Sequence, residues 1–163
     1  MTDTVLFKPD NISLEKTKED FYKILYNNKR LSFELEDILI PFGVDYDKWN
    51  SYVSLETDDE EAINFIKKIE ETIELQTRKI LNNDELVLKS QVRFSKYGWI
   101  IKTKVPKTKH GIKIDCFDRE NRRFSIHDLN ENQDNCDVLL YISYIWIKEQ
   151  QIYYKWHIKK IQL

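Results

Sequence analysis

The chain of 163 residues is short of glycine, proline and cysteine, with three Gly, three Pro and two Cys. So little Gly and Pro excludes collagen-like and low-complexity chains. Cys116 and Cys136 are too few for a disulfide scaffold, so we expect two reduced thiols. No apolar run approaches the roughly 20 residues of a membrane-spanning helix, and the segment MTDTVLFKPD has no feature of a secretory signal. We therefore expect a soluble, cytoplasmic protein without a membrane partner.

The sequence also lacks the usual motifs of enzymes and metal sites. His110, His127 and His157 are isolated, and neither HExxH nor CxxC occurs. A Walker loop (GxxxxGK) and a dinucleotide-binding GxGxxG are missing as well. The acidic residues 58–61 are explained as the first turn of a helix. We expect no enzymatic activity, no metal and no cofactor.

Charge is unevenly distributed along the chain, although the net charge is only −2. Residues 1–90 hold 12 basic and 20 acidic side chains, whereas residues 91–163 hold 14 and 8. The segment 91–114 contains no acidic residue and seven basic ones. Basic residues interleaved with exposed rings are the pattern that single-stranded nucleic acid requires, because cations follow the phosphates and rings stack on bases. An ordinary solvated face is the alternative interpretation of such a run.

The composition, with 41% hydrophobic and 13% aromatic residues, can build a core. We expect one domain over residues 1–163, with 1–30 as an N-terminal extension that carries a short helix at 13–27. Residues 31–40 begin with alternating apolar and polar side chains and end at a turn, which predicts a strand, and residues 51–56 are predicted as a second short strand. A long helix is predicted over 58–81, because Thr57 and Glu60 have capping-box spacing and Ile63, Ile66, Ile69 and Ile73 form one apolar stripe.

From Leu86 onward the pattern is almost entirely β, with strands predicted over 85–95, 98–105, 111–117, 122–126, 138–147 and 152–161. Short strands separated by turns, with one covering helix, predict a mainly β (α+β) chain whose residues 31–163 form an OB-like small β-barrel.

The last two strands predict a stacking platform. If 148–151 is a hairpin loop, Ile147 pairs with Ile152 and the rings Tyr144, Trp146 and Tyr153 share one face with Lys155, His157 and Lys159. The opposite face is core-like and holds Tyr141 and Trp156, and a slip of one residue would exchange the two faces.

A second basic surface is predicted around Pro106–Gly111, where 98–105 and 111–117 would pair as a hairpin. Lys102, Lys104 and Lys113 would share a face of it, with Lys107 and Lys109 at the tip. A smaller cluster contains Arg119, Arg122 and Arg123. The residues that we expect to contact nucleic acid are Arg93, Lys96, Lys102, Lys104, Lys107, Lys109, Lys113, Tyr144, Trp146, Tyr153, Lys155, His157 and Lys159.

Residues 50–163 resemble a known family. The segments IIKTKVPK, IKIDCFDRENRRFSIHDL and VLLYISYIWIKEQQIYYKWHIKKIQL are similar to the C-terminal half of single-stranded-DNA-binding proteins of large cytoplasmic DNA viruses and yeast cytoplasmic linear plasmids. The resemblance implies an OB barrel that coats single-stranded DNA during replication, with Lys102, Lys104, Trp146 and Trp156 in the interface. The chain ends in IQL and not in the acidic, partner-recruiting tail of many such proteins.

The sequence thus predicts a protein that binds single-stranded DNA without sequence preference, by backbone electrostatics and base stacking. Two alternatives remain: binding of RNA, because stacking and phosphate contacts serve both nucleic acids, and a role as a non-binding subunit of a viral-type replication or transcription assembly. Replication proteins are possible partners, and the sequence predicts no oligomeric state.

Overall fold

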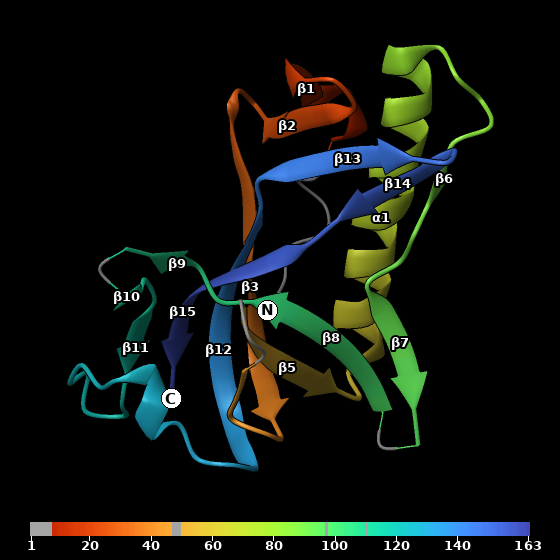
Figure 1. Ribbon diagram of the computed structural model, residues 1–163. Helices are drawn as coiled ribbons and strands as arrows, with labels where there is room; N and C mark the ends of the chain where they lie inside the picture. Colours follow the sequence, from red (N-terminus) through yellow and green to blue (C-terminus); the bar gives the residue numbers. More distant parts are fainter. Residues whose placement is uncertain (1–7, 47–49, 97, 110) are drawn as a thin grey trace.

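The computed structural model describes residues 8–46, 50–96, 98–109 and 111–163, and it contains a closed barrel of five strands (Figure 1). These strands are β3 (Lys29–Ile40), β5 (Ser51–Thr57), β8 (Gly98–Lys104), β12 (Gln133–Ile142) and β15 (Trp156–Gln162). They are arranged in the order β3–β5–β8–β15–β12, and β12 pairs with β3 to close the barrel. Only β8 and β15 run parallel within this ring. The predicted OB-like, mainly β fold is therefore confirmed.

A second group of strands continues the sheet beyond the barrel. It contains β1 (Ile12–Lys18), β2 (Phe21–Tyr26), β13 (Tyr144–Lys148), β14 (Gln151–Tyr154) and β6 (Val87–Leu88). β2 pairs with the start of β3, with β1 and with β13, and β14 pairs with both β13 and β6. The β13–β14 hairpin therefore connects β12 to β15 and lies beside the N-terminal strands (Figure 1).

Shorter elements complete the chain. They are the 3₁₀ turns η1 (Pro9–Asn11) and η2 (Ile126–Asp128) and the strands β4 (Val44–Tyr46), β7 (Val92–Ser95), β9 (Lys107–Thr108), β10 (Gly111–Ile112) and β11 (Asp115–Phe117). β7 pairs with β8, and β11 runs parallel to the end of β15. No helix in the described part of the chain is long and apolar enough to cross a membrane.

The helix predicted over residues 13–27 is wrong, because this segment forms the β1–β2 hairpin. Asn27 and Asn28 have φ values of 52° and 60°, which fits a two-residue type I′ turn that leads β2 into β3. β2 gains backbone hydrogen bonds from three neighbouring strands, and Ile24 is buried against the core. Tertiary pairing thus overrides the helix-compatible spacing of the apolar residues.

The long helix α1 (Glu60–Leu81) confirms the second helix prediction within two residues. Asp59 is the N-cap and accepts hydrogen bonds from the backbone N–H groups of Glu61 and Ala62, so the predicted capping box at Thr57 and Glu60 is not formed. Asn82 ends the helix in the left-handed conformation. The predicted isoleucine stripe is buried at 63, 66, 69 and 73, and it holds α1 against the barrel.

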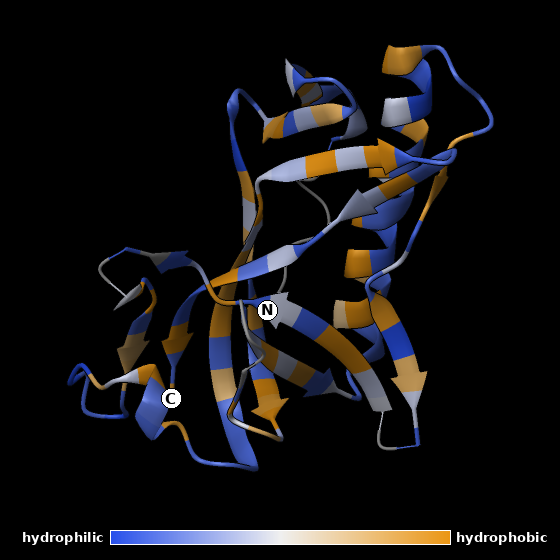
Figure 2. Cartoon of the chain, viewed as in Figure 1, coloured by the Kyte–Doolittle hydropathy of each residue, from blue (hydrophilic) through white to orange (hydrophobic). Residues whose placement is uncertain are grey.

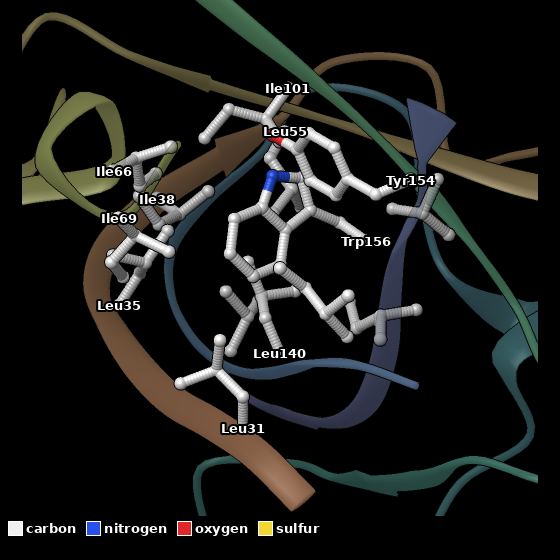
Figure 3. Packing of buried hydrophobic residues seen from close by; sticks show 14 of the residues in the cluster. Leu31, Leu35, Ile38, Leu55, Ile66, Ile69, Ile101, Leu140, Tyr154 and Trp156 are labelled. Carbon is white, nitrogen blue, oxygen red and sulfur yellow. The ribbon is translucent and has the colours of Figure 1, made fainter. Parts of the chain in front are cut away.

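The core fills the barrel and the space beneath α1. Figure 3 shows the Trp156 indole at its centre, among Leu55, Ile101 and Leu140, and all four side chains are at most 1% exposed. The ring of Phe33 meets Trp156 edge-on at a centroid distance of 4.9 Å. In Figure 2, β8 and β12 carry both hydrophobic and hydrophilic bands, as expected for strands that are only partly buried in the core.

Several predicted strand boundaries differ from the structure. Residues 85–95 contain two short strands, β6 and β7, and residues 122–126 form only one isolated bridge before η2. The strands predicted over 138–147 and 152–161 are interrupted at Ser143 and Lys155. Segments 98–105 and 111–117 do not pair with each other, because β8 completes the barrel and β11 pairs with β15, so only β9 and β10 form the predicted hairpin.

Candidate nucleic-acid interface

The β13–β14 hairpin has the predicted register, with Ile147 opposite Ile152. Glu149 and Gln150 form its turn with φ values of 51° and 63°, which are typical of a type I′ turn. Such turns match the right-handed twist of the two strands and fix their register. The side chains on each face of the hairpin therefore follow from the local sequence.

Three rings on neighbouring strands form an aromatic row: Phe21 of β2, Trp146 of β13 and Tyr153 of β14. Phe21 pairs with Trp146, and Trp146 pairs with Tyr153, so all three lie on one face of the sheet. The centroid distances are 6.2 Å and 5.8 Å, and both interplanar angles are 13°. All three rings are partly exposed. The row therefore offers π-surfaces that can stack on bases.

Both ends of the aromatic row carry a cation. The Lys18 ammonium lies 4.3 Å from the centroid of Phe21, and the Lys89 ammonium lies 5.7 Å from the centroid of Tyr153. Each ammonium is attracted by the negative face of its ring. A polyanion that reached the row would meet positive charge at both ends.

A hollow of about 430 Å³ opens beside the row. The β1–β2 hairpin, β8, β13 and β15 line it through Thr17, Lys18, Phe21, Lys104, Tyr144, Trp146, Lys155 and His157. Six of the predicted interface residues gather in or beside this hollow: Lys104, Tyr144, Trp146, Tyr153, Lys155 and His157.

Three further hollows continue from the first. Two of them share lining residues with it, and the last shares lining residues with one of those two. One, of about 130 Å³, lies between Tyr52, Lys102 and Lys155. Another, of about 420 Å³, lies beyond His157 and reaches Lys107. The last, of about 300 Å³, continues from Tyr141 and is lined by Arg30, Pro106, Lys113, Ile114, Asp115 and Lys159. We call these four hollows together the basic groove.

The basic groove is strongly positive. Its described lining includes Lys18, Arg30, Lys102, Lys104, Lys107, Lys113, Lys155 and Lys159, whereas Asp115 is the one carboxylate among those lining residues. Asp115 is itself paired with Arg123, at 2.9 Å. Clefts lined by one sign of charge concentrate ions of the opposite sign. The groove is therefore suited to a polyanionic ligand.

His157 lies where two of the hollows meet, opposite Lys104 on the parallel strand β8. Its ring stacks on the Tyr141 ring at a centroid distance of 5.1 Å. The Arg30 guanidinium lies 4.2 Å from the centroid of the same Tyr141 ring. Burial, followed by repulsion from Lys104, lowers the pKa of His157 from 6.5 to about 4, and the backbone at Lys155 opposes this shift. The imidazole is therefore neutral near pH 7.

The remaining predicted interface residues lie at the ends of the groove or outside it. Arg93 is paired with Ile100, so strand alternation places it on the same outer face of the sheet as Lys102 and Lys104. Lys96 lies in the β7–β8 turn, at the end of β8 farther from the groove, and Lys109 is exposed between β9 and β10. Neither lines one of the four hollows.

Five basic or aromatic residues of the groove escaped the sequence prediction of the interface: Lys18, Phe21, Arg30, Tyr52 and Tyr141. Lys18 and Phe21 fall in the segment assigned to a helix, which hid the pairing of Lys18 with Phe21 and that of Phe21 with Trp146 of β13. Tyr52 contacts the Lys102 ammonium at 4.1 Å across β5 and β8. The Asn27–Asn28 pair was a local signal for the β2–β3 hairpin, because both residues tolerate a positive φ.

Trp156 and Tyr141 were both predicted on the core-like face of the hairpin strands. Trp156 is fully buried, as the face argument predicted, so the interface role implied for it by resemblance is not supported. Tyr141 is buried as expected, at 7% exposure, but it also stacks on His157 and lines two hollows. The pairing shifts between Leu139 and Leu140, and this irregularity turns Tyr141 to the side of His157.

The smaller arginine cluster is largely neutralised. Arg122 pairs with Asp118 and Glu120, at 3.1 Å and 3.3 Å, and Arg123 pairs with Asp115. Backbone hydrogen bonds at Arg122 are the main cause that lowers the pKa of Asp118. In the described part of the chain, no group of three His, Cys, Asp or Glu side chains is placed to hold a metal ion.

Comparison with known proteins yields structural likenesses only. No protein-family model and no curated sequence matches the chain. The single-stranded DNA-binding protein from bacteriophage Enc34 has a TM-score of 0.55 and 14% identity over 93% of this chain and 88% of that one. The same phage protein in complex with ssDNA gives 0.53 and 13%, over 94% of each chain. The bacteriophage T7 single-stranded DNA-binding protein gp2.5 gives 0.51 and 14%, over 82% and 86%. At these identities the likeness establishes that this chain shares their fold.

Proposed function

We propose that this protein binds single-stranded DNA in the basic groove. The observation that carries the proposal is the combination of a continuous row of groove cations with the exposed aromatic row beside it. Cations that track a flexible backbone, together with rings that stack on unpaired bases, are the recognition mode of single-stranded nucleic acid. The two phage proteins compared above are single-stranded DNA-binding proteins by name, which supports the same ligand.

The position of the groove on the barrel also supports the proposal. OB folds bind oligonucleotides on the face of their second and third strands and on the loops that join strands one to two and four to five. In this barrel those strands are β5 and β8, which carry Tyr52, Lys102 and Lys104. The connection between the fourth and fifth strands, β12 and β15, is the β13–β14 hairpin with Trp146 and Tyr153.

Binding in this groove does not depend on base identity in our proposal, because every base offers a π-face and every nucleotide a phosphate. A role in coating single-stranded DNA during replication, in the cytoplasm and in the manner of the large-virus and linear-plasmid proteins that the sequence resembles, belongs to the same proposal. RNA binding is an outcome of the test below, since the same contacts serve both nucleic acids.

The test is a titration of intrinsic tryptophan fluorescence with oligo-dT, oligo-U and duplex DNA at several salt concentrations. We expect oligo-dT to quench the emission, because Trp146 stacks on a base, and duplex DNA to have little effect. Equal binding of oligo-U would assign the groove to single strands of either kind. Failure of all three to bind would refute the proposal and leave a non-binding assembly subunit.

Two variants locate the binding site. Lys102→Glu combined with Lys104→Glu removes two groove cations. The negative slope of log K against log salt should therefore become shallower by about 1.4, at roughly 0.7 for each phosphate that the groove no longer neutralises. Trp146→Ala loses about 1–3 kcal/mol of stacking, which weakens the affinity about fivefold to 150-fold. Lys68→Glu with Lys79→Glu changes the net charge equally on exposed positions of α1, and this control should keep the wild-type slope.

A further inference from the structure

Two described residues that line the basic groove, Trp156 and His157, each have a buried side-chain nitrogen without a partner, and of the two only His157 can take up a proton. Its Nδ1 atom is buried and has no hydrogen-bond partner of good geometry among the described residues, although the backbone at Lys155 is near enough to favour the protonated ring, and the ring lines two hollows. A buried nitrogen without a hydrogen-bond partner is costly in a folded protein, so its presence calls for an explanation. Neither the fold nor the aromatic row uses this atom.

The surroundings of His157 are cationic on every side. β8 contributes Lys104, which pairs with it, and the junction between β14 and β15 contributes Lys155. Arg30 of β3 approaches across the Tyr141 ring of β12. Lys18 and Lys107 line the two adjoining hollows from the β1–β2 hairpin and from β9. No carboxylate is among the described residues that line these two hollows.

A phosphate in the groove would reverse this electrostatic environment. One phosphodiester anion beside Lys104 offsets the repulsion that those cations exert on a protonated ring, and it accepts a hydrogen bond from an imidazolium N–H. It also replaces part of the solvation that burial removes from the charged ring. The protonated state, which is disfavoured in the free protein, thus becomes favourable in the complex.

We propose that His157 binds a backbone phosphate in its protonated form, so that the protein takes up a proton when it binds single-stranded DNA. This inference rests on the proposed function and adds a pH dependence and a residue role to it. Binding then becomes tighter as the pH falls through the range in which the bound histidine titrates.

The size of the effect follows from the two protonation states. If the pKa of His157 rises from about 4 in the free protein to its ordinary 6.5 in the complex, affinity increases about twentyfold between pH 7 and pH 5. At pH 6 the same pKa values require an uptake of about 0.7 proton for each binding event. Above about pH 7.5 the linkage becomes small, because both states are then largely neutral.

The experiment measures the dissociation constant of a fluorescently labelled oligo-dT, about 16 nucleotides long, from pH 5 to pH 7.5 at constant ionic strength. Thymine and the phosphodiesters do not titrate in this range, so the pH response reports on the protein. Calorimetry of the wild-type protein at pH 6, in two buffers with different ionisation enthalpies, counts the protons directly and needs no variant.

His157→Gln keeps a polar side chain but cannot titrate, so its affinity should change less than about threefold across the range. His127→Gln replaces an exposed histidine of η2 and should keep the full wild-type response. The inference is overturned if wild type and His157→Gln show the same pH dependence and calorimetry finds no proton uptake, while DNA binding itself persists. Absence of binding at every pH would instead refute the proposed function, and this inference with it.

Discussion

A hydrogen bond on the core side of the aromatic hairpin allows a sharp stability prediction. Tyr154 follows Tyr153 of the aromatic row, but its side chain points to the opposite face and is fully buried. Its hydroxyl donates to the Glu70 carboxylate of α1 at 2.5 Å. Ser90 and the backbone N–H of Gln91 donate to the same carboxylate oxygen. Glu70 therefore links α1, the segment before β7 and β14.

Tyr154→Phe removes the hydroxyl and leaves the ring volume unchanged. A hydrogen bond to a charged group contributes about 1.5–3 kcal/mol, so we expect a loss of about 2 kcal/mol in the free energy of unfolding. For a chain of this length that corresponds to a fall of about 6 °C in Tm. The assay is thermal unfolding followed by circular dichroism at pH 7.

The control is Tyr153→Phe, which removes a hydroxyl that donates to Gln151 on the exposed surface, at 2.6 Å. It should cost less than about 0.5 kcal/mol. If Tyr154→Phe shifts Tm no more than Tyr153→Phe does, the proposed link through Glu70 carries no stability and the reasoning is wrong.

The pH dependence gives a second check on the same group. Burial, followed by repulsion from Glu70, raises the pKa of Tyr154 well above 10. A raised folded-state pKa contributes stability that is fully present below the unfolded-state pKa of about 10 and is lost as the pH rises further. The contribution of Tyr154 to stability should therefore hold from pH 7 to pH 9 and decline above pH 10.

Two other predictions concern the core. Ile69→Ala changes a fully buried position of α1, so it should lower the free energy of unfolding, measured in denaturant melts, by about 3 kcal/mol. Leu75→Ala changes a half-exposed position of the same helix and should alter the free energy of unfolding by less than about 0.5 kcal/mol. Equal losses would contradict the assigned buried face. Burial is the main cause that raises the pKa of Cys116 to about 12 and that of Cys136 to about 11. Neither thiol should therefore react with iodoacetamide at pH 8 until the protein is unfolded, and mass spectrometry of the treated protein measures this.

Local sequence patterns were sufficient where one element determines its own geometry. The isoleucine spacing of α1 predicts its buried face, because side chains three and four residues apart share one side of a helix. The register of the β13–β14 hairpin follows in the same way from its short turn, which places Trp146 opposite Tyr153. The charge of the 91–114 segment is likewise a property of the sequence alone.

The N-terminal segment shows why such patterns fail when pairing is not local. Leu14, Phe21, Ile24 and Leu25 fit a helical stripe, and the sequence does not reveal that β13, more than a hundred residues away, pairs with β2. Strand pairing of this kind satisfies backbone groups through long-range partners, which local propensity cannot indicate. The helix prediction was therefore wrong, and Phe21 was missed as a member of the aromatic row.

The sequence by itself determined the components of the candidate interface: a barrel-forming β pattern, a covering helix, an acid-free basic segment and a hairpin rich in aromatic residues. Only the tertiary structure decided how they meet. Parallel pairing of β8 with β15 brings Lys104 beside His157, and the shifted pairing of β12 with β15 turns Tyr141 towards the same ring. Barrel closure sets both contacts, because the position of each strand depends on partners that are distant in the chain.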